Sequence, residues 1–121
     1  MKELNQSDII AAFENFSNLR ARMIEEEWGN QDPNATDDLT YFNLMDAEIS
    51  KITNTLSRNV EGIEIKIWLM LIFNLESGED EMHALKRNID HFGIHYEKFD
   101  ADVRLIISAI QSLRDEQFCR Y

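Results

Sequence analysis

The sequence has few of the residues that break or cross-link a chain: one proline, four glycines and one cysteine among 121 residues. An all-β fold needs many turns, and this composition offers too few breakers to make them. Long stretches without glycine or proline are typical of helices. The sequence therefore predicts an all-α fold, a single helical domain over residues 1–121 built as a bundle of four to five helices.

Long apolar runs are also missing. The longest, Ile67–Phe73, is far shorter than the roughly 20 residues that span a bilayer. The first residues of the chain are polar and no apolar segment follows them, so we expect no secretory signal. Cys119 has no second cysteine to pair with, which suits a reducing compartment. These features predict a cytoplasmic protein without disulfides and without membrane contact.

Basic residues are scarce: 12 lysines and arginines stand against 23 acidic residues, which gives a net charge of −11. Nucleic-acid backbones and anionic membranes attract positive surfaces, so neither is expected as a direct partner. The same charge permits long-range attraction to a basic protein.

Apolar residues at spacings of three and four predict two long helices, over about residues 7–28 and 37–58, separated by the breaker segment around Pro33. Each helix has one apolar stripe that is expected to face the core. The first stripe is Ile9, Phe13, Phe16, Leu19 and Met23, and the second is Leu39, Phe42, Met45, Ile49, Ile52 and Leu56.

Residues 60–75 allow two interpretations. Ile63, Ile65 and Ile67 alternate as in a strand, whereas the apolar run up to Phe73 suits a buried helix. A strand here would have only residues 92–96 as a partner, and a lone two-stranded ribbon is marginally stable. We therefore predict a central helix.

Two further helices are expected in the C-terminal half. Ser77 is predicted as an N-cap with Asp80 three residues later, a variant of the capping box. The helix that follows carries Met82, Leu85, Ile89 and Phe92, and Gly93 interrupts or ends it. The last helix begins near Asp100.

Helical bundles often hold metal ions, but the ligand patterns are incomplete here. A ferritin-like site needs two Glu-x-x-His motifs, and the chain has one loose match, Asp80-x-x-His83. His91 and His95, four residues apart, allow zinc binding from one helical face. The third ligand would have to be Asp90, Glu97 or His83. Surface histidines are more often simply polar, so we predict neither a metal site nor a cofactor.

Two glutamate pairs resemble the magnesium ligands of all-helical pyrophosphohydrolases: Glu61-x-x-Glu64 and Glu76-x-x-Glu79. On one continuous helix, Glu64 and Glu76 would lie about 18 Å apart, too far to share an ion. There is also no glycine-rich phosphate loop and no recognisable nucleophile with its base. We therefore predict no catalytic residues and no enzymatic activity.

The acidic residues are unevenly distributed. No lysine or arginine occurs in the 28 residues between Arg22 and Lys51, which carry −8 of the net −11. Glu25, Glu26 and Glu27 fall in the expected last turn of a helix, where the dipole disfavours negative charge. A sequence shaped only for stability would place lysine or arginine there.

The same segment holds aromatic residues, of which Trp28 and Tyr41 allow two interpretations: each is partly exposed, or each covers the edge of the core. Aromatic anchors surrounded by carboxylates give an interface both affinity and electrostatic steering toward a basic target. The predicted partner-binding residues are Glu25, Glu26, Glu27, Trp28, Asp32, Asp37, Asp38, Tyr41, Asp46 and Glu48.

In size, charge and this carboxylate-plus-aromatic segment, the chain resembles the acidic helical immunity proteins that neutralise bacterial toxins of the colicin-nuclease and contact-dependent growth inhibition systems. The resemblance implies a non-enzymatic inhibitor, monomeric or weakly dimeric, of a basic toxin domain such as a nuclease. Two alternatives within binding proteins are a nucleic-acid-mimicking phage or regulatory protein and a subunit of a larger helical assembly. The alternative from another class is a metal-dependent helical-bundle enzyme using Asp80, His83, Asp90, His91 and His95.

Overall fold

The computed structural model describes residues 6–29 and 38–115, with side chains described over 8–26 and 39–115. The chain divides into two compact units, Met1–Gly62 and Ile63–Tyr121, each with its own internal packing. The prediction of a single domain over the whole chain stays a prediction, and the two units are described separately.

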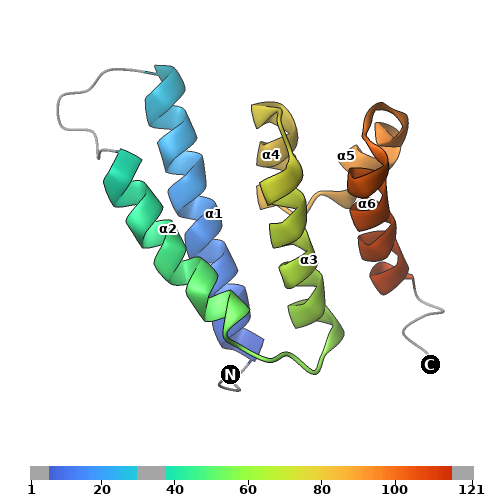
Figure 1. Ribbon diagram of the computed structural model, residues 1–121, viewed down its shortest axis with the longest axis horizontal. Helices are drawn as coiled ribbons and strands as arrows, with labels where there is room; N and C mark the ends of the chain where they lie inside the picture. Colours follow the sequence, from blue (N-terminus) through green and yellow to red (C-terminus); the bar gives the residue numbers. More distant parts are fainter. Residues whose placement is uncertain (1–5, 30–37, 116–121) are drawn as a thin grey trace. The chain divides into compact units, whose positions relative to one another are not determined.

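The all-α prediction is confirmed, because the described residues form helices and no strand (Figure 1). Six α-helices occur in these residues, more than the four to five predicted, because the expected fourth helix is broken into two. They are α1 (Gln6–Gly29), α2 (Asp38–Thr53), α3 (Val60–Asn74), α4 (Gly78–Leu85), α5 (Ile89–Ile94) and α6 (Ala101–Arg114), with a short 3₁₀ helix, η1 (Tyr96–Lys98), before α6.

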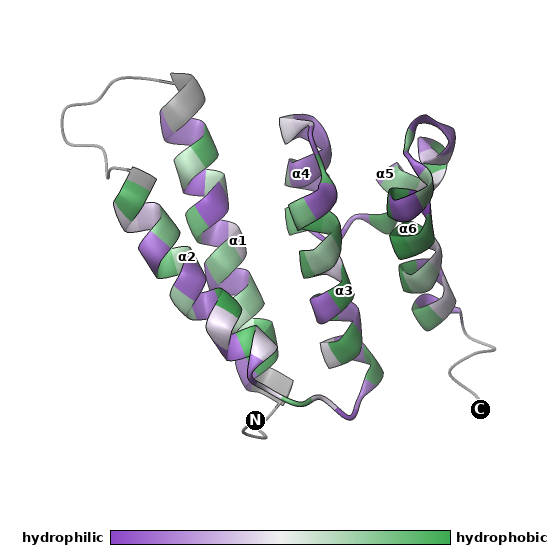
Figure 2. Ribbon diagram, in the orientation of Figure 1, coloured by the Kyte–Doolittle hydropathy of each residue, from purple (hydrophilic) through white to green (hydrophobic). Residues whose placement is uncertain are grey.

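In the first unit, α1 and α2 lie side by side and run in opposite directions (Figure 1). Apolar and polar residues alternate along both helices (Figure 2). This pattern gives each helix one side to pack against the other. The packed residues of α1 include Ile9, Phe13, Phe16 and Met23, four of the five predicted, and Leu19 is half-buried.

The predicted stripe of α2 has the right period but is partly in the wrong phase. Met45 and Ile52 are buried as expected. Leu39 and Phe42 are instead 68% and 48% exposed, and Tyr41 takes the inward position with only 2% exposure. Tyr41 can be buried because its hydroxyl finds an acceptor on α1, as described below. The helix also ends at Thr53, five residues before the predicted end at Arg58.

Segment 60–75 is a helix, α3, so the strand alternative is wrong. The expectation of a buried helix is met on one side only, because Ile63, Met70 and Phe73 on the other side are exposed. Its side chains with little or no solvent exposure are Glu64, Ile65, Trp68, Leu69, Leu71 and Ile72.

In the second unit, aromatic side chains join successive helices. The Trp68 ring of α3 lies 5.8 Å from the Phe92 ring of α5, and Phe92 lies 5.7 Å from Phe99, which precedes α6. Ile107 and Ile110 complete this core from α6, and both are fully buried. Asp100 is the N-cap residue of α6, as the sequence predicted.

The capping prediction for α4 is confirmed: Ser77 is the N-cap, and its Oγ accepts a hydrogen bond from the Asp80 backbone N–H. The helix ends early because Arg87 adopts a left-handed backbone conformation with φ of 54°. A residue in that conformation cannot continue a right-handed helix. The chain therefore turns between α4 and α5, six residues before the predicted interruption at Gly93.

Candidate functional site

The predicted docking segment lies on α1, α2 and their connection. Side chains are described for five of its ten predicted residues: Glu25, Glu26, Tyr41, Asp46 and Glu48. The other five predictions lie outside the described side chains, namely Glu27, Trp28, Asp32, Asp37 and Asp38.

Tyr41 and Glu26 form a contact between the two helices rather than a free surface. The Tyr41 hydroxyl donates a hydrogen bond of 2.8 Å to Glu26 Oε1, and the Tyr41 side chain is buried. Of the two interpretations of Tyr41, the structure selects the one in which it covers the core, and Tyr41 is therefore not an exposed docking residue. A charge-assisted hydrogen bond at this position joins α2 to the C-terminal part of α1.

Glu48 is largely buried and pairs with a lysine of the same helix. Its side chain is only 13% exposed, and Lys51 Nζ donates to its Oε1 at 3.1 Å. The second carboxylate oxygens of Glu48 and Glu26 are buried without a hydrogen-bond partner. Neither residue therefore presents a freely solvated carboxylate to a partner.

Glu25 and Asp46 are the exposed carboxylates among the five described side chains. Asp46 lies four residues after Phe42 and seven after Leu39, so that all three fall on the same side of α2. We call the surface formed by Leu39, Phe42 and Asp46 the outer face of α2. It combines two exposed apolar side chains with one exposed negative charge.

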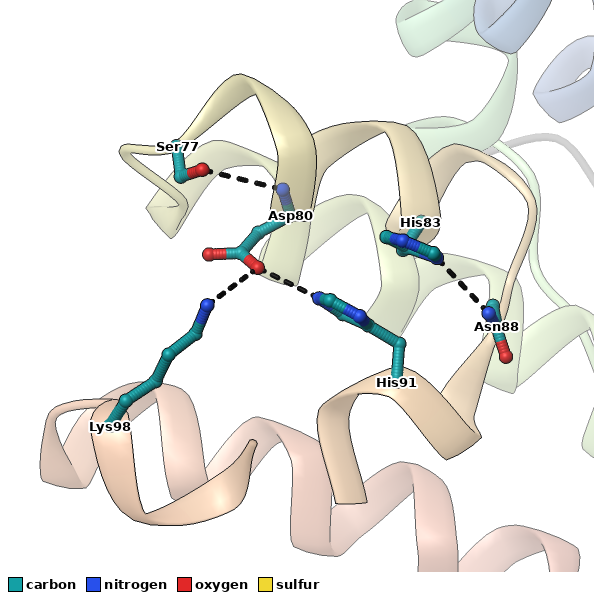
Figure 3. A network of polar contacts seen from close by, with 6 residues as sticks. All are labelled: Ser77, Asp80, His83, Asn88, His91 and Lys98. Atoms are coloured by element: carbon teal, nitrogen blue, oxygen red, sulfur yellow. Dashed lines mark hydrogen bonds and ion pairs between the residues drawn. The ribbon is translucent and has the colours of Figure 1, made fainter. Parts of the chain in front are cut away.

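A second group of polar residues lies in the C-terminal half (Figure 3). It brings together four of the five residues named above for the alternative enzyme, Asp80, His83, His91 and His95, and adds Lys98, which the sequence did not indicate. Asp80 Oδ1 is joined to His91 Nε2 at 2.8 Å and to Lys98 Nζ at 3.0 Å. Burial would raise the pKa of Asp80, but the hydrogen bonds from His91 and Lys98 and their charges outweigh it and hold that pKa below its usual value. The ionised Asp80 is an acceptor only, so His91 Nε2 carries a proton.

His83 stacks on His91, with ring centroids 3.8 Å apart and the rings nearly parallel at 7°. The Asn88 amide nitrogen lies 3.0 Å from His83 Nδ1, within hydrogen-bond distance. His95 lies next to them, 4.8 Å from His91, so all three histidines of the chain gather at this point.

This arrangement joins helices and does not converge on an ion. Asp80, His91 and Lys98 come from α4, α5 and η1, and Asp80 ties the three elements together. The stacked rings of His83 and His91 place their nitrogen lone pairs in parallel planes, not toward one point. Over residues 6–29 and 38–115, no group of three or more His, Cys, Asp or Glu side chains has metal-binding geometry.

Glu64 is placed in a contact between α3 and α6. Its carboxylate accepts two hydrogen bonds from Arg114, of 2.8 and 3.0 Å, and one of 3.1 Å from Trp68 Nε1. Burial would raise the pKa of Glu64, but the hydrogen bonds and charge of Arg114 and the indole hydrogen bond hold it below its usual value. The Glu64 hydrogen bonds in turn raise the pKa of Arg114.

A hollow of about 310 Å³ lies next to the contact of Asp80 with His91 and Lys98, and it is bordered by Ser77, Asp80, Lys98 and Phe99.

None of the described helices is long and apolar enough to cross a membrane. Comparison with protein-family models, with curated proteins and with solved structures finds no match to this chain.

Proposed function

We propose that this chain is a non-enzymatic acidic binding protein that inhibits a basic protein partner, such as a toxin nuclease domain, in the way that immunity proteins do. The observation that carries the proposal is the segregation of charge. The segment between Arg22 and Lys51 has eight acidic residues and no basic one, whereas the other 93 residues have 15 acidic and 12 basic residues.

The position of these charges adds support. Glu25 is exposed near the C-terminal end of α1, and the last turn of α1 contains no basic residue. Negative charge near a helix C-terminus costs stability. A binding role accounts for keeping it, because a negative surface accelerates association with a positively charged partner.

The experiment starts from the neighbouring gene. Its product is purified with this chain, and association is measured by stopped flow or surface plasmon resonance. A basic neighbour that binds tightly and loses its own activity on binding supports the proposal. A neighbour that belongs to a phage structural operon and does not bind contradicts it.

Charge reversal then localises the interaction. Glu25→Lys with Asp46→Lys should slow association about tenfold and reduce its dependence on salt, because steering is lost. The reversal avoids Glu26, since a lysine there would remove the acceptor of the buried Tyr41 hydroxyl.

The matched control is Glu76→Lys with Glu97→Lys, two exposed residues outside the acidic segment that make the same change in net charge. The control variant should associate nearly as fast as the wild-type chain. Equal slowing by both pairs would mean that only net charge matters and that no localised docking surface exists.

A further inference from the structure

The outer face of α2 carries the largest described apolar exposure in the acidic segment. Leu39 and Phe42 are 68% and 48% exposed, while Met45 and Ile52 of the same helix are buried against α1. Exposed apolar side chains that lie together on one side of a helix, here beside the carboxylate of Asp46, are typical of a surface that another molecule covers.

The apolar spacing of α2 allows a second arrangement, in which Phe42 is buried and Tyr41 is exposed. Phe42 continues the apolar spacing of Met45, and burying it would have placed Tyr41 outside. The fold instead buries Tyr41, whose hydroxyl bonds to Glu26, and leaves Phe42 outward. An exposed phenylalanine beside a buried tyrosine is the reverse of what solvation alone favours.

The charged side chain on this face is negative. Asp46 is exposed on it, and the first base after it in the sequence, Lys51, is engaged with Glu48 at 3.1 Å. Lys51 also lies five residues after Asp46, about 140° further around the helix. A cation brought to the outer face of α2 therefore meets a carboxylate and no nearby base from α2.

We infer that the outer face of α2 is the docking surface, and that it receives an amphipathic basic helix of the partner. This inference rests on the proposed function and adds the site and the kind of segment bound. Apolar side chains of the partner helix cover Leu39 and Phe42, and a lysine or arginine pairs with Asp46.

A second copy of the chain is a poorer occupant. Two identical outer faces would bring Asp46 of each copy into the same interface, between molecules that each carry −11. Like charges placed together in an interface oppose association.

The test uses the full-length chain and a fluorescent probe peptide of about 18 residues, five helical turns, with leucine on one side and lysine on the other. The peptide should bind, and Phe42→Ala and Leu39→Ala should each weaken it about tenfold. Asp46→Asn should weaken it less and flatten its dependence on salt. A peptide of equal charge with glutamine in place of leucine should bind much more weakly.

Leu44→Ala is the matched control. Leu44 lies on the same helix and is 48% exposed, as Phe42 is. It lies two residues further on, about 200° around the axis, and so faces away from the outer face. Its replacement should change binding less than twofold. Circular dichroism checks that every variant is folded.

The possible failures are distinguishable. Equal weakening by Phe42→Ala and Leu44→Ala, equal binding of both peptides, or no binding of the leucine–lysine peptide each overturns the outer face as the docking surface. None of these results affects inhibition of a basic neighbour, which is measured separately. Sedimentation that shows a dimer abolished by Phe42→Ala would make a second copy the occupant and also overturn the inference.

Discussion

Gly62 illustrates how one residue joins a loop to a helix. It is buried in the first turn of α3, and a Cβ placed there would lie 2.7 Å from Ser57 Cβ and 2.0 Å from Ser57 Oγ. The hydroxyl can rotate, but Ser57 Cβ is fixed to the backbone, so the loop before α3 has to move to admit any side chain.

Gly62→Ala should therefore lower the free energy of unfolding by about 1–3 kcal/mol in urea denaturation. The control is the same substitution in a Ser57→Gly background, where both clashing atoms are absent. There the alanine should be neutral or stabilising by up to about 1 kcal/mol, because alanine favours helix over glycine. A loss of stability in both backgrounds would show that Ser57 is not the obstacle.

Tyr41 and Phe42 show which part of the α2 packing could be predicted from the sequence and which part could not. The period of the α2 stripe was predictable because apolar residues recur every three or four positions. Its phase was not, since Tyr41 and Phe42 are both aromatic and adjacent. The choice between them depends on Glu26, fifteen residues earlier, which supplies the acceptor for the Tyr41 hydroxyl. The side of α2 that is buried therefore depends on a contact with α1 and cannot be predicted from either helix alone.

Among the helices, α3 and α6 are joined through one carboxylate. Burial would raise the pKa of Glu64, but Arg114 and Trp68 hold it below the ordinary value of 4.5. Glu64 is therefore ionised in the folded protein at neutral pH. A lowered carboxylate pKa stabilises the fold above the unfolded-state value. That contribution is lost as the pH falls below about 4.5 toward the folded-state pKa.

Glu64→Gln should cost about 2 kcal/mol at neutral pH, since it removes the charge that pairs with Arg114. The difference in unfolding free energy from the wild-type chain should shrink as the pH is lowered from 6 to about 3. Urea denaturation across this range, followed by circular dichroism, measures it. Glu97→Gln, at an exposed position, should show no such convergence, and a pH-independent gap for Glu64→Gln would contradict the role of its charge.

The helices differ in how far the sequence specified them. The ends of α1 and the capping of α4 by Ser77 followed from local residue types. The break between α4 and α5 did not, because Arg87 is an ordinary helix former and only its φ of 54° in the folded chain ends the helix. Asp80 and His91 were named from the sequence only as candidate metal ligands. The contact of Asp80 with Lys98, 18 residues later, was not predicted, because the two residues meet only after that turn.

At the scale of the whole molecule, the net charge of −11 acts on folding and on binding with opposite signs. Like charges repel one another in the compact state, so screening them should stabilise the fold. Attraction to a basic partner is weakened by the same screening. The acidic segment that contains the candidate docking residues could be recognised in the sequence. The sequence did not show which of its side chains are exposed, because that depends on the packing of α1 against α2.

Raising the salt concentration from about 20 mM to about 300 mM should therefore raise the unfolding free energy while it slows association with the leucine–lysine peptide. Glu25→Lys with Asp46→Lys reduces the net charge from −11 to −7, and should raise stability at low salt and weaken both salt effects. Glu76→Lys with Glu97→Lys makes the same change in net charge, so it should match the first pair in the salt dependence of stability. It should differ in association, because neither of its residues lies in the acidic segment between Arg22 and Lys51, whereas Glu25 and Asp46 both do. If the two pairs match in both measurements, charge acts on this protein only as a total.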